Sequence, residues 1–111
     1  MDTRFTQQGS VTVAAVMGSV DPVTSKDLQN DFNAQLQQGH VKIVADFSQV
    51  TYMSSAGFRV LLGVLKECRA KSGDFVIAAA QKNIVQLLEM SGFTNFLKLY
   101  PTVPDAISKF G

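Results

Sequence analysis

Hydrophobic residues fall along this chain in two alternating arrangements. Short, nearly continuous runs rich in Val, Ile, Phe and Ala predict strands, of which the one over 11–20 is expected to be central and buried on both faces. Apolar residues repeated every three or four positions predict amphipathic helices. The runs predict strands over residues 4–8, 11–20, 41–47, 75–80 and 96–100, with a turn at 48–50. The repeats predict helices from 21 to 38, 55 to 72, 83 to 91 and 104 to 110.

Residues at the ends of the predicted helices agree with these boundaries. Asp21 is a good N-cap, and Pro22 after it suits the first helical position. Gly39 is a natural stop for the same helix, and Thr102 is predicted to cap the last one. Strands that alternate with helices imply right-handed crossovers. We therefore expect an α/β fold, with a mixed, mostly parallel sheet of about four or five strands and about four helices.

The composition is that of one folded domain. The chain has 111 residues, of which 46% are hydrophobic and 17% charged, enough for one buried core and too few for two. Ten basic and nine acidic residues give a net charge of +1. No basic run is present, and neutralised phosphates supply most of the affinity for nucleic acid, so we expect no nucleic-acid partner.

Few residues are suited to catalysis or metal binding. The single cysteine, Cys68, excludes an internal disulfide and a multi-cysteine zinc site, and the single histidine, His40, excludes two-histidine metal motifs. The spacing places Cys68 on an apolar helix face, where it is expected to pack in the core. No glycine-rich phosphate loop of the P-loop type is present. We therefore expect a non-enzymatic protein with no metal and no cofactor.

No segment has the features of a membrane span or a signal peptide. Residues 1–8 are polar and lack the apolar centre of a signal peptide. The most apolar stretch, 11–20, is about half the length of roughly 20 residues that a bilayer-spanning helix needs. We expect a cytoplasmic protein without membrane insertion.

The start of the second predicted helix is the most informative part of the chain. A helical wheel gathers Phe58, Leu61, Leu65 and Cys68 on one side, and it gathers Ser55, Arg59, Gly63, Lys66 and Ala70 on the opposite, solvent-facing side. Serine at a helix start is usually an N-cap, but one cap needs one serine, and Ser54 can supply it. Ser55 is then free, at a position where a phosphate is tolerated because a helix N-terminus favours negative charge.

This stretch resembles the signature of STAS-domain anti-sigma factor antagonists. The matching residues are Tyr52-Met53-Ser54-Ser55-Ala56-Gly57-Phe58-Arg59-Val60-Leu61-Leu62. Two further segments agree with the family, and they are Gly18-Ser19-Val20-Asp21 and Leu88-Glu89-Met90-Ser91-Gly92-Phe93. The resemblance covers residues 4–110 and implies one STAS domain. It also implies regulation by partner switching, in which an anti-sigma factor that is a serine kinase binds the unmodified protein, phosphorylates it and releases it, and a serine phosphatase reverses the modification.

The resemblance assigns roles to individual residues. It implies that Ser55 is the phosphoacceptor, with Ser54 as the alternative. Contacts with the partner are implied for Asp21, Ser54, Ala56, Gly57 and Arg59, and support of the motif is implied for Asp46 and Ser48. The chain departs from the family pattern at three positions, since many members have Asp at the position of Ser54, Ser or Thr at that of Ala56, and Gly at that of Arg59.

Alternatives remain open for some of these roles. Asp21 can act as a helix cap instead of touching a partner, and Asp46 can accept hydrogen bonds from nearby backbone N–H groups and so position Ser54 and Ser55. The alternative function is that of a constitutive scaffold of the same fold, such as the STAS subunit of a lipid-transport ATPase complex.

Overall fold

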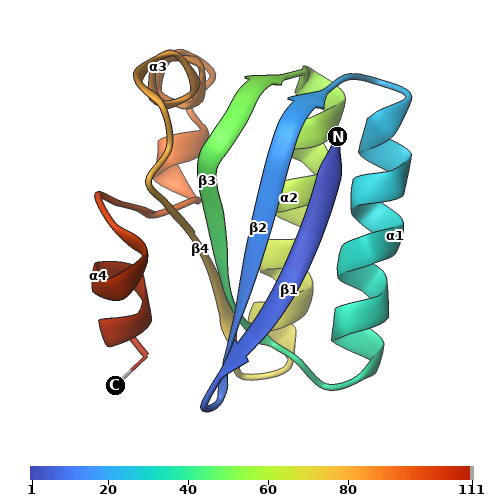
Figure 1. Cartoon of the computed structure of the whole chain (residues 1–111), viewed down its shortest axis with the longest axis vertical. Helices are drawn as coiled ribbons and strands as arrows, with labels where there is room; N and C mark the ends of the chain where they lie inside the picture. Colours follow the sequence, from blue (N-terminus) through green and yellow to red (C-terminus); the bar gives the residue numbers. More distant parts are fainter. Residues whose placement is uncertain (111) are drawn as a thin grey trace.

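The computed structural model describes residues 1–110, which form a five-stranded sheet covered by helices (Figure 1). The elements, in chain order, are β1 (Asp2–Gln8), β2 (Val11–Val20), α1 (Thr24–Gln37), β3 (Lys42–Met53), α2 (Ser55–Ala70), β4 (Asp74–Ala78), α3 (Lys82–Met90), the 3-10 turn η1 (Phe93–Asn95), β5 (Leu99–Tyr100) and α4 (Val103–Ser108). The expected order of strands and helices is confirmed.

The sheet is mixed and mostly parallel, as the alternation of strands and helices predicts. Its strand order is β1-β2-β3-β4-β5. β1 is antiparallel to β2, and the other neighbouring pairs are parallel. Because β2, β3 and β4 run in one direction, α1, α2 and α3, which follow them, all begin at the same edge of the sheet. This carboxyl edge is where residues far apart in the sequence meet.

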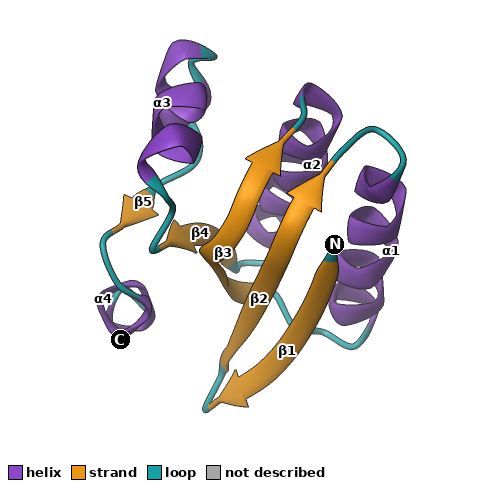
Figure 2. Ribbon diagram, turned by 45° about the horizontal axis from the view of Figure 1, so that its top comes forward, coloured by secondary structure: helices purple, strands orange, loops and turns teal. Residues whose placement is uncertain are grey.

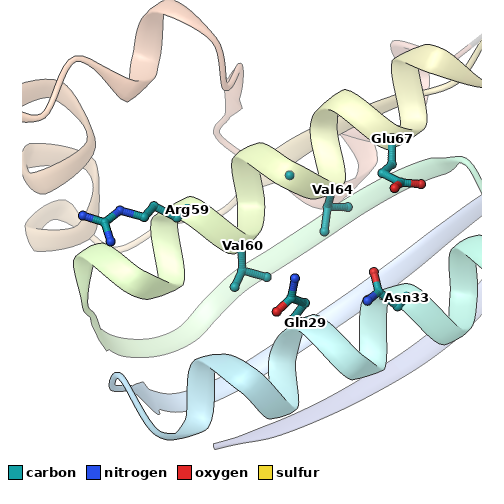
Figure 3. Close-up of a pocket in the computed structure, with 7 residues that line it drawn as sticks. Gln29, Asn33, Arg59, Val60, Val64 and Glu67 are labelled. Atoms are coloured by element: carbon teal, nitrogen blue, oxygen red, sulfur yellow. The ribbon is translucent and has the colours of Figure 1, made fainter.

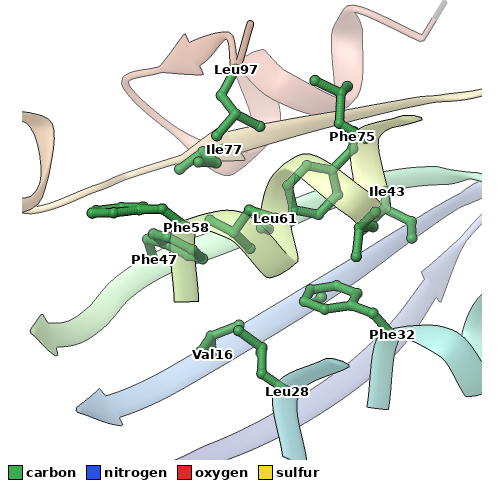
Figure 4. Close-up of a cluster of buried hydrophobic side chains, with 14 of the residues drawn as sticks. Val16, Leu28, Phe32, Ile43, Phe47, Phe58, Leu61, Phe75, Ile77 and Leu97 are labelled. Carbon is green, nitrogen blue, oxygen red and sulfur yellow. The ribbon is translucent and has the colours of Figure 1, made fainter. Parts of the chain in front are cut away.

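Helices cover both faces of the sheet, unequally (Figures 1 and 2). α1 and α2 pack together on one face, over a large cluster of buried side chains that α3 extends (Figure 4). Phe32 of α1 lies at its centre, in edge-to-face contact with Phe5 at 5.8 Å and Phe75 at 5.5 Å between ring centroids. On the other face, α4 covers a smaller cluster around Val44, Val76 and Ala106, which includes the end of β4.

β3 is longer than the hydrophobic pattern predicts. The turn expected at 48–50 is wrong, because β3 continues to Met53 with an irregularity in its pairing to β2. There Ala15 is opposite Asp46 and Met17 is opposite Gln49, so β3 carries one extra residue in a β-bulge. The bulge exposes Ser48 and Gln49 and returns Val50 to the core. Two polar residues in succession therefore marked a bulge, which has the same local composition as a turn.

The end of the chain also differs from its prediction. The strand expected over 96–100 is reduced to Leu99–Tyr100, because Phe93–Asn95 forms a 3-10 turn and Leu97 is buried just after it. β4 ends at Ala78, since the next residue, Ala79, has a positive φ of 59° that a strand does not accommodate. The predicted cap of the last helix is confirmed, because the N–H of Asp105 donates to Oγ1 of Thr102 at 3.2 Å.

Asp74 fastens the last helix to the sheet. Its carboxylate pairs with Nε of Arg69 at 3.3 Å and with Nζ of Lys109, and it accepts a hydrogen bond from the N–H of Phe75 at 2.8 Å. Partial burial by itself would raise the pKa of Asp74. The hydrogen bonds from Lys109 and Phe75 and the positive charges of Lys109 and Arg69 outweigh burial, so the pKa of Asp74 is lowered.

We predict that stability depends on pH through Asp74. A carboxyl group whose pKa is lower in the folded state stabilises the fold above its unfolded pKa, and this contribution is lost as the pH falls through the folded value. At neutral pH, Asp74→Asn should lower the free energy of unfolding by about 1 kcal/mol, a value discounted for partial exposure. The difference from wild type should shrink as the pH falls below the ordinary Asp pKa of about 4 and through the lower folded value, in urea titrations at a series of pH values. The control is Asp2→Asn, which removes the exposed ion pair with Arg4 and should have little effect on stability. A stability difference between Asp74→Asn and wild type that persists in acid would contradict the account.

Two glycines should respond in opposite ways to a methyl group. A Cβ on Gly73 would lie 1.9 Å from the carbonyl oxygen of Val41, whereas a Cβ on Gly63 would meet no atom within 4 Å. Gly73→Ala should therefore destabilise the fold by about 2 kcal/mol or more through overpacking. Gly63→Ala should stabilise it by up to about 1 kcal/mol, because alanine is the better helix former. Equilibrium denaturation of both variants tests this, and equal effects would contradict it.

Candidate functional site

The predicted motif lies at the carboxyl edge of the sheet, where β2 and β3 end side by side. Val20 is paired with Met53, and the N–H of Ser54 donates to the carbonyl of Val20 at 2.8 Å. The turn that leads into α1 is thereby held against the first residues of α2. Asp21 and the two motif serines, which are far apart in the sequence, meet at this edge.

Ser54 is the N-cap of α2. Its backbone is extended, with φ −77° and ψ 166°, and its Oγ accepts a hydrogen bond from the N–H of Gly57 at 3.2 Å. Only 7% of Ser54 is exposed. The prediction that Ser54 supplies the cap is confirmed, and its hydroxyl is both engaged and covered.

Ser55 is the first residue of α2 and is exposed. Within residues 1–110, its hydroxyl takes part in none of the side-chain hydrogen bonds of the structure. The whole predicted outer stripe of the helix is on the surface, including Arg59 one turn further on. The helical spacing therefore distinguished the two serines correctly, one turned inward and the other turned to solvent.

Gly57 has a packing role instead of a surface role. It is buried, and a Cβ at this position would lie 2.8 Å from Cγ of Met53 and 3.0 Å from Cγ1 of Val20. The missing side chain lets the first turn of α2 lie directly on the ends of β2 and β3. The partner contacts implied for Gly57 and for Ser54, which is also buried, stay predictions. Ala56 is half-buried.

Asp21 caps the first turn of α1. Its Oδ1 accepts hydrogen bonds from the N–H of Val23 at 2.9 Å, the N–H of Thr24 at 2.7 Å and Oγ1 of Thr24 at 3.0 Å. The bonds from Thr24 are the main reason that the pKa of Asp21 is lowered, with that from Val23 adding to them. The side chain of Asp21 thus acts as a cap, but the helix start predicted at 21–22 is wrong, because α1 begins at Thr24 with Val23 as its N-cap residue. Asp21 is still half-exposed, and its contact with a partner stays a prediction.

Asp46 and Ser48 act on the bulge of β3. Oδ1 of Asp46 accepts a hydrogen bond from the N–H of Ser48 at 3.0 Å, as expected of a carboxylate beside free backbone N–H groups. No hydrogen bond within residues 1–110 joins Asp46 to the two motif serines, which lie at the far end of the strand. Asp46 therefore shapes the bulge, and positioning of the serines by Asp46 is not direct.

The part of β3 that continues beyond the end of β4 is hydrogen-bonded by side chains at the start of α3, a contact that the sequence did not indicate. Nε2 of Gln81 donates to the carbonyl of Ser48 at 3.0 Å, and Nδ2 of Asn83 donates to the carbonyl of Thr51 at 3.2 Å. β4 has already ended at this level, so these amides take the place of a neighbouring strand. Amide side chains at a helix start give no sequence signal for such a contact.

Two exposed hydrophobic residues flank the serines and were also missed. Tyr52 is 50% exposed and Val23 is 76% exposed. Tyr52 lies in β3, two residues before Ser54, and Val23 lies in the turn into α1, three residues after Val20, whose carbonyl accepts the N–H of Ser54. Aromatic residues are enriched in protein interfaces, so an exposed Tyr at this edge indicates a contact surface. The exposure of these two residues could not be predicted from the sequence, because it depends on how the strands pair and on which side chains the neighbouring elements cover.

A hollow of about 110 Å³ runs between α1 and α2 (Figure 3). Its lining residues include Gln29, Asn33, Arg59, Val60 and Glu67. Sites for cofactors and other small molecules are usually about 300 Å³ or larger, and neither this hollow nor a second one of about 220 Å³, which shares Asn33 and Glu67 with it, reaches that volume. Residues 1–110 contain no group of three or more His, Cys, Asp or Glu side chains that could hold a metal ion. None of the helices in this part of the chain is long and apolar enough to cross a membrane.

Cys68 is buried in the main core, as its place on the apolar face predicts. Burial, with the carboxylates of Asp74 and Glu67, raises the pKa of its thiol to about 12. The thiol therefore stays protonated at neutral pH and is a poor nucleophile.

The different environments of the two serines should appear in their stability effects. Ser54→Ala removes the cap and leaves the N–H of Gly57 unpaired, so it should lower the free energy of unfolding by about 1 kcal/mol. Ser55→Ala removes an exposed hydroxyl and should change it by less than about 0.5 kcal/mol. Chemical denaturation measures both, and a larger loss for Ser55→Ala would contradict the assignment.

Comparison with known proteins agrees with this geometry. The family model described as the STAS domain matches residues 3–106. BtrV of Bordetella bronchiseptica, which is named as an anti-sigma factor antagonist, is 32% identical over 89 residues, or 80% of this chain and 74% of BtrV.

Two solved structures share the fold. An anti-sigma factor antagonist from Mycobacterium paratuberculosis has a TM-score of 0.88 and 25% identity over 97% of this chain and 92% of its own. SpoIIAA of Bacillus in its phosphorylated form has a TM-score of 0.75 and 18% identity over 99% of this chain and 100% of its own. The resemblance seen in residues 52–62 is thereby confirmed, and the chain belongs to the STAS domain family.

Proposed function

We propose that this chain is an anti-sigma factor antagonist whose binding is switched off by phosphorylation of Ser55. The observation that carries the proposal is the contrast between the two motif serines, since Ser55 is exposed with a free hydroxyl and Ser54 is buried with its hydroxyl engaged. The names of BtrV and of the mycobacterial structure support the role of antagonist. A phosphorylated form is known for SpoIIAA, which has the same fold.

The modification needs a kinase and a phosphatase as partners. The kinase transfers the γ-phosphoryl group of a nucleoside triphosphate to Oγ of Ser55. A P–O bond to Ser55 forms, the bond to the bridging oxygen of the nucleotide breaks, the hydroxyl proton is released and a nucleoside diphosphate leaves. A phosphatase restores the serine by hydrolysis, which releases inorganic phosphate. The role of this chain is to present the hydroxyl, and it needs no catalytic residue of its own.

A phosphate on Ser55 would be tolerated by the fold but would oppose the binding of a partner. A phosphate carries a charge of −1.5 to −2 at neutral pH, and the start of a helix favours negative charge. At an interface, the same group must lose water, which costs several kcal/mol unless a cation of the partner compensates it. A penalty of about 3 to 5 kcal/mol weakens a complex by roughly two to four orders of magnitude. Release of the partner therefore requires no unfolding.

The surface around Ser55 is suited to a protein partner. Tyr52 and Val23 provide exposed apolar area, and Asp21, Ala56 and Arg59, at or just before the starts of α1 and α2, provide polar or small groups. Such a mixture of apolar residues with a polar surround is typical of reversible interfaces. We propose these five residues as the partner-contact surface, with an anti-sigma factor that is a serine kinase as the partner in the cytoplasm.

We predict that charge at position 55 abolishes capture of the partner. Immobilised wild-type protein and Ser55→Ala should retrieve the anti-sigma factor kinase from a lysate of the source organism, and Ser55→Asp should retrieve at least tenfold less, because one added charge opposes burial of the surface. Ser72→Asp is the matched control, since Ser72 is an exposed serine beyond the other end of α2; it should behave as wild type.

Two outcomes would contradict the proposal. Equal capture of the same kinase by wild type, Ser55→Ala and Ser55→Asp would show that position 55 does not control binding. A stoichiometric complex that is insensitive to substitution of both Ser54 and Ser55 would instead support a constitutive scaffold of the same fold.

A further inference from the structure

Arg59 is a surface cation without a carboxylate partner. Within residues 1–110, no carboxylate oxygen lies within 4.0 Å of its guanidinium, whereas Arg69 pairs with Asp74 and Lys71 pairs with Glu67 on or beside the same helix. Figure 3 shows the guanidinium of Arg59 extending away from Gln29 and Asn33, the polar residues across the hollow. Nothing in this part of the chain holds the Arg59 head group.

The positions one turn from Arg59 hold no acidic residue. Leu62 and Gly63 follow it at these spacings, and Ala56 and Ser55 precede it. Side chains four residues apart on a helix are neighbours, with Cβ atoms about 6 Å apart, and the favourable order for an ion pair places the negative group first. Ser55 occupies that first position. A negative charge on Ser55 would complete a pair that the unmodified helix lacks.

We propose that Arg59 is the intramolecular counter-ion of the phosphate on Ser55. This inference rests on the modification of Ser55 in the proposed function. The guanidinium can donate two parallel N–H bonds to phosphate oxygens, which a flexible ammonium group does less well. The backbone N–H groups of the first turn of α2 also favour the phosphate, and they do so equally whatever residue stands at position 59. The contribution that a substitution at position 59 removes is therefore that of the Arg59 side chain.

Pairing with Arg59 has consequences for regulation. The phosphate is held on its own helix, so phosphorylated protein keeps its fold, and the phosphate stays dianionic over a wider range of pH. Arg59 also lines one end of the hollow between α1 and α2, so its movement toward the phosphate changes the surface there as well.

Other charged groups lie at the same edge of the sheet. α1 and α3 also begin at this edge, and Asp21, Lys26, Asp27 and Lys82 lie at or just before their first turns. Their charges contribute a background field at the phosphate. Since they are unchanged in a variant of Arg59, comparison of that variant with wild type isolates the contribution of Arg59.

The test uses protein with phosphoserine incorporated at position 55 during translation, so that no kinase is needed. The second pKa of the phosphate, about 6 in an unpaired phosphoserine, is measured by a ³¹P NMR pH titration at physiological ionic strength. Arg59→Gln should raise this pKa by roughly 0.2 to 0.4, and Arg59→Lys should raise it by less because it keeps the charge. Lys66→Gln is the control. Lys66 lies on the same exposed stripe but about 16 Å along the helix from Ser55, beyond the screening length of roughly 8 Å at physiological salt.

Each outcome decides the inference. A shift for Arg59→Gln that exceeds the shift for Lys66→Gln and disappears in concentrated salt supports the pairing. Equal values for wild type and Arg59→Gln, or an equal shift in Lys66→Gln, would overturn it. Failure of the proposed function would be recognised separately, by the binding of partners to position-55 variants, because the NMR titration does not depend on a natural kinase.

Discussion

The hydrogen bond from the N–H of Gly57 to the hydroxyl of Ser54 determines the rest of the site. It caps α2, turns Ser54 inward and begins the helix at Ser55. The absent side chain of Gly57 lets that first turn rest on Met53 and Val20, where a Cβ would lie only 2.8 Å from Cγ of Met53 and 3.0 Å from Cγ1 of Val20. The hydroxyl of Ser54 is thereby engaged in capping the helix, and the hydroxyl of Ser55 is left accessible. The orientation of Ser55 follows from packing, since its hydroxyl makes no hydrogen bond within residues 1–110 that could orient it.

The fold separates the site from the contacts that secure the end of the chain. The motif lies at the carboxyl edge of the sheet, where β2 and β3 end and α1, α2 and α3 begin. The ion pairs of Asp74 with Arg69 and Lys109 lie at the start of β4, at the opposite edge, and hold α4. A change of charge at Ser55 therefore acts on the surface close to it. This arrangement suits a protein that has to change its partners while its core stays intact.

Much of this could be predicted from the sequence because the deciding effects are local. Helical periodicity placed Ser55 and Arg59 outward and Cys68 inward, and side-chain chemistry identified the caps at Asp21, Ser54 and Thr102. The features that could not be predicted from the sequence depend on pairing between strands. The bulge at Ser48 has the composition of a turn, and the burial of Gly57 is set by β2 and β3 together. The exposure of Tyr52 and Val23 likewise depends on what the neighbouring elements leave uncovered.

The central claim is that Ser55, and not its neighbour, is the residue that the cell modifies. Tandem mass spectrometry of phosphopeptides from the protein isolated from its native cells tests this directly, since fragment ions distinguish adjacent serines. The account predicts a phosphorylated fraction with the phosphate on Ser55. Phosphate found on Ser54, or protein that is unmodified under every growth condition, would contradict it.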